Sequence, residues 1–316
     1  MSSPKISIVI PYLKEEELDR CIKSINKQKY KNKEIISGTE KTEGFKERKS
    51  IGFMRNYLAK RASGDILLFL DSDAEFVSDK ELNKLIELFN AFKKSNPKIV
   101  AITGLQIAPK KEISLLNWLV GLDYEYRIKV MGEGIVNVGA STIFAIRNNA
   151  FWEINGFVGS SVGEDWNFSE KLNRRGYEMY HTNKIKIYHY TAVNLFGYLK
   201  KQFKYTSYRV HHFKTFKKVT DSYTRPSMIV QTVLFFLLAV SLLLTPYSFD
   251  FIFASYAMLL LIFFWDMPKV LKLYGKTRNA KVFLLLPLSF IRSFVRAIAT
   301  VRGFWDFYIM SKDLPK

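Results

Sequence analysis

Short apolar runs and helically spaced apolar positions alternate along the first part of the chain. The runs Ile6 to Ile10 and Ile66 to Leu70 are rich in aliphatic and β-branched residues, which predicts strands buried on both faces of a parallel sheet. Ser78 and Glu81 are spaced as a capping box ahead of the next helix. Further strands are predicted at 34–36, 98–103 and 184–188, and helices at 18–28, 54–62, 82–92 and 167–175. This alternation predicts an α/β fold, a Rossmann-like open and mostly parallel sheet with helices on both faces.

The last third of the chain has a different pattern, with long apolar runs and few charges. Ile229 to Thr245 and Phe251 to Trp265 lie back to back, and with their flanking residues they predict membrane spans at about 228–246 and 249–266. The alternative is a pair of buried helices in a soluble domain. A third apolar segment, about 282–303, carries polar residues on one helical face, among them Arg292 and Arg296. It is predicted to be either a third span with a polar inner face or an interfacial helix.

Charge strengthens the membrane interpretation. The chain has 316 residues with 48 Lys+Arg and 29 Asp+Glu. Residues 1–190 have a net charge of +6, whereas the shorter and more apolar part 191–316 has a net charge of +13. An apolar and strongly basic segment favours an anionic membrane leaflet as partner, and nucleic acid is not expected. A single cysteine, Cys21, excludes a disulfide framework and is expected in the core. No cleaved secretory signal is expected.

The distribution of positive charge predicts the orientation. The turn 246–250 has no Lys or Arg, whereas the segment 200–225 and the predicted loop 267–281 are rich in both. The positive-inside rule places these basic segments and the N-terminal domain in the cytosol, at the cytoplasmic membrane. Aromatic residues alternate with lysines over 195–216, which predicts an amphipathic helix on the leaflet, with an ordinary solvated helix as the alternative. We therefore divide the chain into a sheet domain (1–190), basic interfacial helices (191–226) and a membrane region (227–316).

Two pairs of carboxylates lie at the ends of predicted elements, where they could bind a cation or act as a general base. Asp71 and Asp73 leave the end of the strand Ile66 to Leu70, where a pair of carboxylates can hold Mg²⁺ or Mn²⁺. Glu164 and Asp165 open a predicted helix, so either could be presented from a loop as a general base. Both sets also have purely structural interpretations, as a solvated turn and as acidic residues that favour a helix N-terminus.

The order of these motifs resembles that of family 2 inverting glycosyltransferases with the GT-A fold, over about residues 5–190. The resemblance lies in the opening strand with Glu15, in Arg55 and Asn56, in the D-x-D of Asp71 and Asp73, in Gly139 and Ala140 before the strand 143–147, in Gly156 and Phe157, in Glu164 and Asp165, and in His189. Membrane-anchored members of this family also carry C-terminal spans.

The resemblance implies a transferase that uses a nucleoside-diphosphate sugar and Mg²⁺ or Mn²⁺. It implies Asp71, Asp73 and His189 as metal ligands and Asp165, with Glu164, as catalytic groups. It implies donor contacts from Pro11, Tyr12, Glu15, Glu40, Arg55, Asp71 and Ser72, and acceptor-side positions at Gly139, Ala140, Trp166 and Gln202. The membrane region suggests a lipid-linked acceptor, either a polyprenyl phosphate, a lipid-linked oligosaccharide or a glycolipid.

The sequence departs from the family pattern in two places. The Asp pair expected after the second strand is replaced by a segment in which Glu40 is the substitute, so the nucleobase is not predicted. The motif of processive polysaccharide synthases retains only its glutamine, Gln202, which favours transfer of a single sugar. The open alternatives are a processive synthase, a nucleotidyltransferase and a non-catalytic membrane scaffold.

Overall fold

The computed structural model describes residues 3–47, 49–109, 114–159, 162–190, 194–217, 222 and 226–310. These residues form two compact units. The sheet unit contains the described part of residues 1–113 and 127–191, and the helical unit contains the described part of 114–126 and 192–313. Helix α4 (Leu115–Met131) contributes its residues up to Tyr126 to the helical unit.

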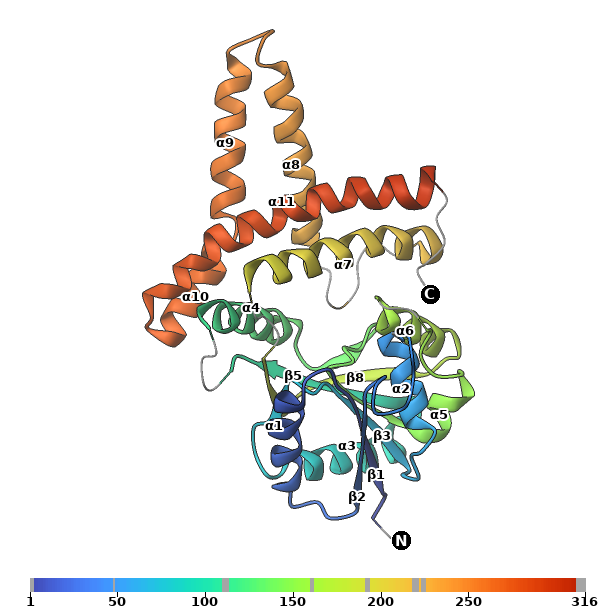
Figure 1. The fold of residues 1–316 in the computed structure, drawn as a ribbon. Helices are drawn as coiled ribbons and strands as arrows, with labels where there is room; N and C mark the ends of the chain where they lie inside the picture. The colour runs from blue at the N-terminus through green and yellow to red at the C-terminus, as the bar shows by residue number, and fades with distance from the viewer. Residues whose placement is uncertain are drawn as a thin grey trace. The chain divides into compact units, whose positions relative to one another are not determined.

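A single curved sheet organises the sheet unit. Within the described residues it has eight strands in the order β2-β1-β3-β7-β5-β8-β4, with β6 paired to β8 (Figure 1). Three of its strand pairs are parallel and four are antiparallel, so the sheet is mixed where the sequence predicted a mostly parallel one. The strands are β1 (Ile6–Pro11), β2 (Lys33–Gly38), β3 (Ile66–Leu70), β4 (Ala74–Phe76), β5 (Ile99–Ile107), β6 (Gly134–Val136), β7 (Ile143–Arg147) and β8 (Glu178–His189).

Helices cover both faces of this sheet, as predicted. Alternate residues of β1 enter two different cores: Ile8 packs with residues of α1 and α3, whereas Val9 packs with residues of α2, α5 and α6. This two-sided burial is why the central strand β3 is apolar at every position. Cys21 lies in the first core and is fully buried, so its predicted place is confirmed. The helices are α1 (Glu15–Asn26), α2 (Ile51–Ala59), α3 (Glu81–Ser95), α5 (Asn148–Glu153) and α6 (Glu164–Arg174).

The start of α3 differs from the predicted capping box. The residue that caps α3 is Lys80, and the Ser78 hydroxyl instead donates to Glu81 Oε1 at 2.6 Å. Glu81 is almost fully buried and accepts the backbone N–H of Lys186 at 2.8 Å. The Glu81 carboxylate therefore accepts a backbone hydrogen bond from strand β8 and does not cap the N-terminus of α3.

The helical unit contains a hairpin formed by α8 (Pro226–Leu244) and α9 (Asp250–Phe264). The predicted loop after α9 is instead the helix α10 (Met267–Thr277), which Pro268 starts in a position that suits proline. A 3₁₀ turn (Ala280–Leu284), α11 (Leu285–Phe304) and a π-helical turn (Trp305–Ile309) follow, and α7 (Leu195–Phe216) precedes the hairpin. Three helical stretches of the described chain, 226–244, 250–277 and 280–309, are long and apolar enough to cross a membrane, which indicates a membrane protein.

The polar face of α11 contacts protein, which is one of the environments that the sequence allowed. Arg292 Nη1 donates to Asp123 Oδ2 at 2.6 Å, and Arg296 Nη2 donates to Gln202 Oε1 at 2.8 Å. The ammonium of Lys269 in α10 also lies 2.6 Å from Asp123 and 2.8 Å from Asp266. We call Asp123, Asp266, Lys269 and Arg292 the helical-unit charge cluster.

Candidate active site

The tight turn after β3 places two carboxylates at the edge of the sheet. Asp71 donates its backbone N–H to Thr142 O at 3.2 Å, and Ala74 donates its own to Asp71 O at 3.1 Å. Strand β4 begins at Ala74 and pairs with β8 so that Ala74 lies opposite His189. The strand pairing thus brings His189, from the end of β8, beside Asp73.

Asp71, Asp73 and His189 form a cluster with the chemistry of a cation site. One ligand atom from each lies within 4.8 Å of the other two, and His189 Nε2 is 3.2 Å from Asp73 Oδ1. Two ligand atoms at right angles on an ion with bonds of about 2.1 Å lie about 3.0 Å apart, so this spacing fits neighbouring ligands of Mg²⁺ or Mn²⁺. Carboxylate oxygen and imidazole are a donor set that Mn²⁺ accepts.

The orientation of His189 is fixed by a residue that the sequence did not reveal. Gln106 Oε1 lies 2.9 Å from His189 Nδ1, and Gln106 is buried near the end of β5. A hydrogen bond at Nδ1 leaves Nε2 facing the two aspartates, as in most histidine ligands. Gln106 lies beyond the predicted strand 98–103, and the apolar Leu105 and Ile107 on either side of it are the signal that the strand continues past Thr103.

Arg55 joins the D-x-D turn to the second acidic motif. Its Nη2 lies 2.8 Å from Asp71 Oδ1, and its Nη1 lies 2.8 Å from Glu164 Oε1. The guanidinium is buried and packs over the ring of Phe157. Burial alone would lower the pKa of Arg55, but Asp71 and Glu164 raise it overall. Arg55 therefore stays charged and holds two carboxylates that are far apart in the sequence.

Three carboxylates gather at this site. Asp71, Asp73 and Glu164 carry negative charge, and Arg55 lies between Asp71 and Glu164. We call these four side chains, with His189, the acidic site. Carboxylates in close contact repel one another unless a cation or proton compensates them. A divalent cation held by Asp71 and Asp73 would reduce that repulsion.

Helix α6 presents Glu164 and Asp165 from its first turn. Gly163 caps the helix with a φ of 71°, a conformation that favours glycine. Asp165 Oδ1 accepts the backbone N–H of Trp166 at 2.9 Å, and Asp165 is partly exposed. Because Glu164 contacts Arg55, the first turn of α6 is connected to the D-x-D turn.

The residues predicted to contact the donor gather at the ends of β1 and β2. Pro11 is paired with Gly38, and Tyr12 donates its N–H to Gly38 O at 3.2 Å. Glu15 begins α1 and Glu40 lies in the turn after β2. Since β2, β1 and β3 are parallel neighbours, these groups and Ser72 follow strand ends at the same edge of the sheet.

The residues predicted on the acceptor side are divided between the two units. Gly139 donates its N–H to Ser169 Oγ at 3.1 Å, and a Cβ added to it would lie 2.6 Å from the ring of Phe144, so only glycine fits there. Ala140 and Trp166 lie in the same unit and are half-buried. Gln202 belongs to the helical unit, where it is buried against Arg296.

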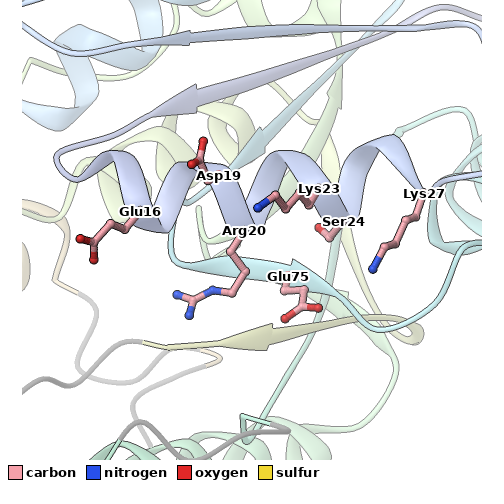
Figure 2. Close-up of a pocket in the computed structure, with 7 residues that line it drawn as sticks. All are labelled: Glu16, Asp19, Arg20, Lys23, Ser24, Lys27 and Glu75. Atoms are coloured by element: carbon pink, nitrogen blue, oxygen red, sulfur yellow. The ribbon is translucent and has the colours of Figure 1, made fainter.

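A cavity of about 430 Å³ lies between α1 and β4 and is lined by both acidic and basic side chains (Figure 2). Arg20 reaches from α1 toward the strand that carries Glu75, and its guanidinium lies 3.9 Å from the centre of the Tyr190 ring. Tyr190 donates its hydroxyl to Glu75 at 3.1 Å, and burial together with Glu75 raises the pKa of Tyr190 to about 12. The cavity is lined by Glu16, Asp19, Arg20, Lys23, Ser24, Lys27 and Glu75.

Comparison with known proteins was informative only at the level of structure. No protein-family model and no curated protein matches the chain. The structure is similar to that of the mannosyltransferase PcManGT from Pyrobaculum calidifontis in complex with GDP-Man and Mn²⁺, with a TM-score of 0.56 and 14% identity over 96% of this chain and 88% of that one. Less similar are GalNAc-T7 with UDP, GalNAc and Mn²⁺ (TM-score 0.44, 14% identity, 60% and 44% covered) and S. aureus TarS 1–349 (TM-score 0.42, 13% identity, 65% of each chain covered). The chain has the GT-A fold of glycosyltransferases, as its sequence predicted.

Proposed function

We propose that this protein is a membrane-bound, metal-dependent glycosyltransferase. It transfers a single sugar from a nucleoside-diphosphate sugar, with inversion, to a lipid-linked acceptor at the cytosolic leaflet. The observation that carries the proposal is the acidic site: within a GT-A fold, Arg55 connects the D-x-D turn to the first turn of α6. A chain that kept the fold only as a scaffold would not need Asp71, Asp73 and His189 within ligand distance of one another at this edge of the sheet.

Asp71, Asp73 and His189 would hold Mg²⁺ or Mn²⁺ in this proposal. The ion supplies positive charge to the diphosphate as the leaving group becomes more negative. The similarity to a mannosyltransferase in complex with GDP-Man and Mn²⁺ supports both the class of donor and the kind of ion. Pro11, Tyr12, Glu15, Glu40 and Ser72 are the proposed donor contacts at the neighbouring strand ends.

Asp165 acts on the acceptor in the proposed reaction. An acceptor oxygen attacks the anomeric carbon from the face opposite the leaving group, the bond to the diphosphate breaks, and the configuration inverts. When the acceptor is a hydroxyl, Asp165 takes its proton as general base. When the acceptor is an ionised phosphate, there is no proton to remove, and Asp165 orients it instead.

We propose for Arg55 a positioning role in place of a contact with the donor diphosphate. Both Nη atoms of Arg55 already bind carboxylates, and its side chain is only 3% exposed. A guanidinium held in this way keeps Asp71 and Glu164 at a fixed separation. Arg55 thereby aligns the cation ligands with the turn that carries Asp165.

The lipid-linked acceptor is proposed from the helical unit. The α8–α9 hairpin is mostly exposed and apolar, as a membrane span requires, since only 22% and 11% of the span windows of these two helices are buried. The lysines of α7 and α10 follow the positive-inside rule for a cytosolic sheet unit. An enzyme anchored in this way meets acceptors that are themselves embedded in the leaflet.

The test is a donor screen with the full-length protein in detergent. Purified protein is incubated with a panel of nucleotide sugars, polyprenyl phosphate and Mg²⁺ or Mn²⁺, and the released nucleotide is measured. We expect release of nucleoside diphosphate with one donor, dependence on the cation, and its loss in excess chelator. Asp79→Asn, which changes an exposed acid paired with Lys29, is the matched control and should keep full activity. Release of pyrophosphate would indicate a nucleotidyltransferase, and release unaffected by chelator would reject the metal site.

A further inference from the structure

The middle of α11 is held by residues from three other elements of the helical unit. Arg292 contacts Asp123 of α4, the Tyr198 hydroxyl of α7 at 3.2 Å, and Asp266, which directly precedes α10, at 3.6 Å. Asp123 and Arg292 are 2% and 5% exposed. This pair therefore fixes where the midpoint of α11 lies.

The position of Asp123 in the chain limits the depth at which α11 can lie. Eight helical residues and a short connection separate Asp123 from Gly134, where strand β6 of the sheet begins. That length of chain reaches about 20 Å, at about 1.5 Å per helical residue and about 3.5 Å per extended one. It is shorter than the hydrocarbon core of a bilayer, about 30 Å. The midpoint of α11 therefore cannot reach the far leaflet. Because the centre of the bilayer is only about 15 Å deep, the other contacts of α11 decide its depth within the near half.

Contacts with the hairpin agree with this position. Ser293 Oγ lies 3.3 Å from Gln231 Oε1 in the first half of α8, and the ring of Phe290 packs on Phe263 near the end of α9. Both contacts are at the open end of the hairpin, away from its turn. The second half of α11 follows α7, where Ser207 Oγ donates to Ala299 O at 3.0 Å (Figure 1). Ala297 of this half also packs with Phe235 and Leu238 in the middle of α8. Figure 1 shows α11 running across the base of the hairpin beside α7.

The opposite face of α11 is apolar and exposed. At helical spacing it presents a stripe in which each side chain is 38–55% exposed. Leu243 and Phe253 on the hairpin are likewise exposed, at 75% and 73%, so both surfaces are suited to an apolar medium. Trp305 and Tyr308 are typical of the headgroup level, and Lys281 and Arg302 suit anionic lipid. The stripe consists of Ile291, Phe294, Ile298, Val301, Trp305 and Tyr308.

We infer that α11 lies in the plane of the membrane and does not cross it, with this stripe in a phospholipid monolayer on the side of the sheet unit. The chain then crosses the bilayer twice, through α8 and α9, and Met310 lies on the same side as the sheet unit. α7 and α11 form a platform at that surface. The inference rests on the membrane location in the proposed function and not on the transferase reaction.

Single-cysteine labelling tests the topology. The native Cys21 is buried and should not react, so cysteines introduced at Tyr247, Lys46 and Met310, which are all exposed, report their own positions. The variants are expressed in a bacterial inner membrane, and intact spheroplasts are treated with a membrane-impermeant maleimide. We expect labelling of Tyr247→Cys and none of Met310→Cys or Lys46→Cys, with all three labelled after lysis.

Each other outcome has a separate meaning. Labelling of Met310→Cys in intact spheroplasts, with Lys46→Cys protected, would show that α11 crosses and would overturn the inference. Protection of Tyr247→Cys would show that the hairpin does not cross the membrane. This result would contradict the membrane location in the proposed function, and the inference about α11 would fail as well. Donor turnover measured on the same variants reports separately on the transferase.

Depth measurements distinguish the two arrangements along the helix. Nitroxide labels at Ile291, Ile298 and Trp305 are compared in vesicles of phosphatidylcholine and phosphatidylglycerol. A helix in the plane gives similar depths at all three positions. A crossing helix changes depth by about 10 Å over each seven residues, from a rise of about 1.5 Å per residue. Such a gradient would overturn the inference even if the labelling pattern were as expected.

Discussion

The two units of this protein each contain a buried arginine between two carboxylates. In the sheet unit Arg55 contacts Asp71 and Glu164, and in the helical unit Arg292 contacts Asp123 and Asp266. The contact distances overlap, since the shortest contact is 2.8 Å in the first group and 2.6 Å in the second. The difference between the groups lies in what surrounds the arginine.

Exposure and the neighbouring side chains separate the two groups. Asp71 is 29% exposed and lies beside Asp73 and His189, whereas Asp123 is 2% exposed and is paired with both Arg292 and Lys269. A closed group of ion pairs fixes the packing of helices. A partly open group with two carboxylates and a histidine within ligand distance of one another is suited to bind a cation. The contacts of an arginine therefore do not reveal its role until the other side chains around it are known.

The largest effect is expected from a substitution in the acidic site. Asp73→Asn removes one ligand charge, and we expect turnover to fall by about 10⁴-fold, since a cation on the leaving group contributes several kcal/mol. Circular dichroism and thermal unfolding of the variant should match the native protein. Asp79→Asn is the control for loss of a surface carboxylate. Full turnover in Asp73→Asn would show that Asp73 does not hold the catalytic ion.

The second effect is expected in the helical unit. Arg292→Met removes one of the two cations that contact Asp123 and Asp266, the other being Lys269, and losing one partner of a buried ion pair costs about 3–5 kcal/mol. Thermal unfolding in detergent measures the loss. The double variant Arg292→Met with Asp123→Leu keeps the neutral Lys269–Asp266 pair, so it should be more stable than the single variant. A double variant that is less stable than Arg292→Met would contradict a role in charge neutralisation.

The third prediction concerns Asp165. With a hydroxyl acceptor, Asp165→Asn should lower turnover by about 10²- to 10³-fold, because proton removal is lost. With polyprenyl phosphate as acceptor the loss should be much smaller, because that oxygen is already ionised. Glu164→Gln is compared under the same conditions, since it weakens the contact with Arg55 and leaves Asp165 in place. Equal losses with both acceptors would assign Asp165 to orientation alone.

Local patterns predicted the parts of this site that are local. The buried strand Ile66–Leu70 and the two aspartates after it are adjacent in the sequence, so one pattern gives both. The first turn of α6 and the place of His189 at a strand end followed in the same way. The resemblance to glycosyltransferases predicted that these residues belong to one site, and the GT-A fold that it implied is confirmed.

Contacts between distant residues were not predictable from a single sequence. Arg55 and Glu164 are 109 residues apart, and Arg292 and Asp123 are 169 apart. The mixed sheet arises because β7 lies antiparallel between β3 and β5, and an apolar strand has the same pattern in either direction. Helix α4 escaped detection because the run Leu115 to Leu122 is apolar on all sides. The polar face of α11 was visible, but one of its partners, Asp123, lies on that missed helix.

Cation binding gives a fourth and smaller effect. Mn²⁺ at about 100 times its dissociation constant should stabilise the native protein by about 2.7 kcal/mol, seen as a rise in unfolding temperature. Asp73→Asn should lose this rise, and Asp123→Asn should keep it, because Asp73 belongs to the candidate cation site whereas Asp123 is paired with Lys269 and Arg292. If Asp123→Asn abolished the rise in unfolding temperature, the cation would bind in the helical unit and not at the acidic site.

The smallest effect comes from a third ion pair, which is partly exposed. Glu34 accepts from Lys5, Ser7 and Ser63, and although burial alone would raise the pKa of Glu34, these hydrogen bonds lower it to about 2. A folded pKa below the unfolded value of about 4.3 means that this contribution is present above pH 4.3 and is lost as the pH falls toward 2. Because the pair is partly exposed, Glu34→Gln should cost about 1 kcal/mol at pH 7. Thermal unfolding of both proteins from pH 7 to pH 2 should show this difference shrinking as Glu34 becomes protonated, and a difference that does not depend on pH would mean that Glu34 contributes through packing and not through charge.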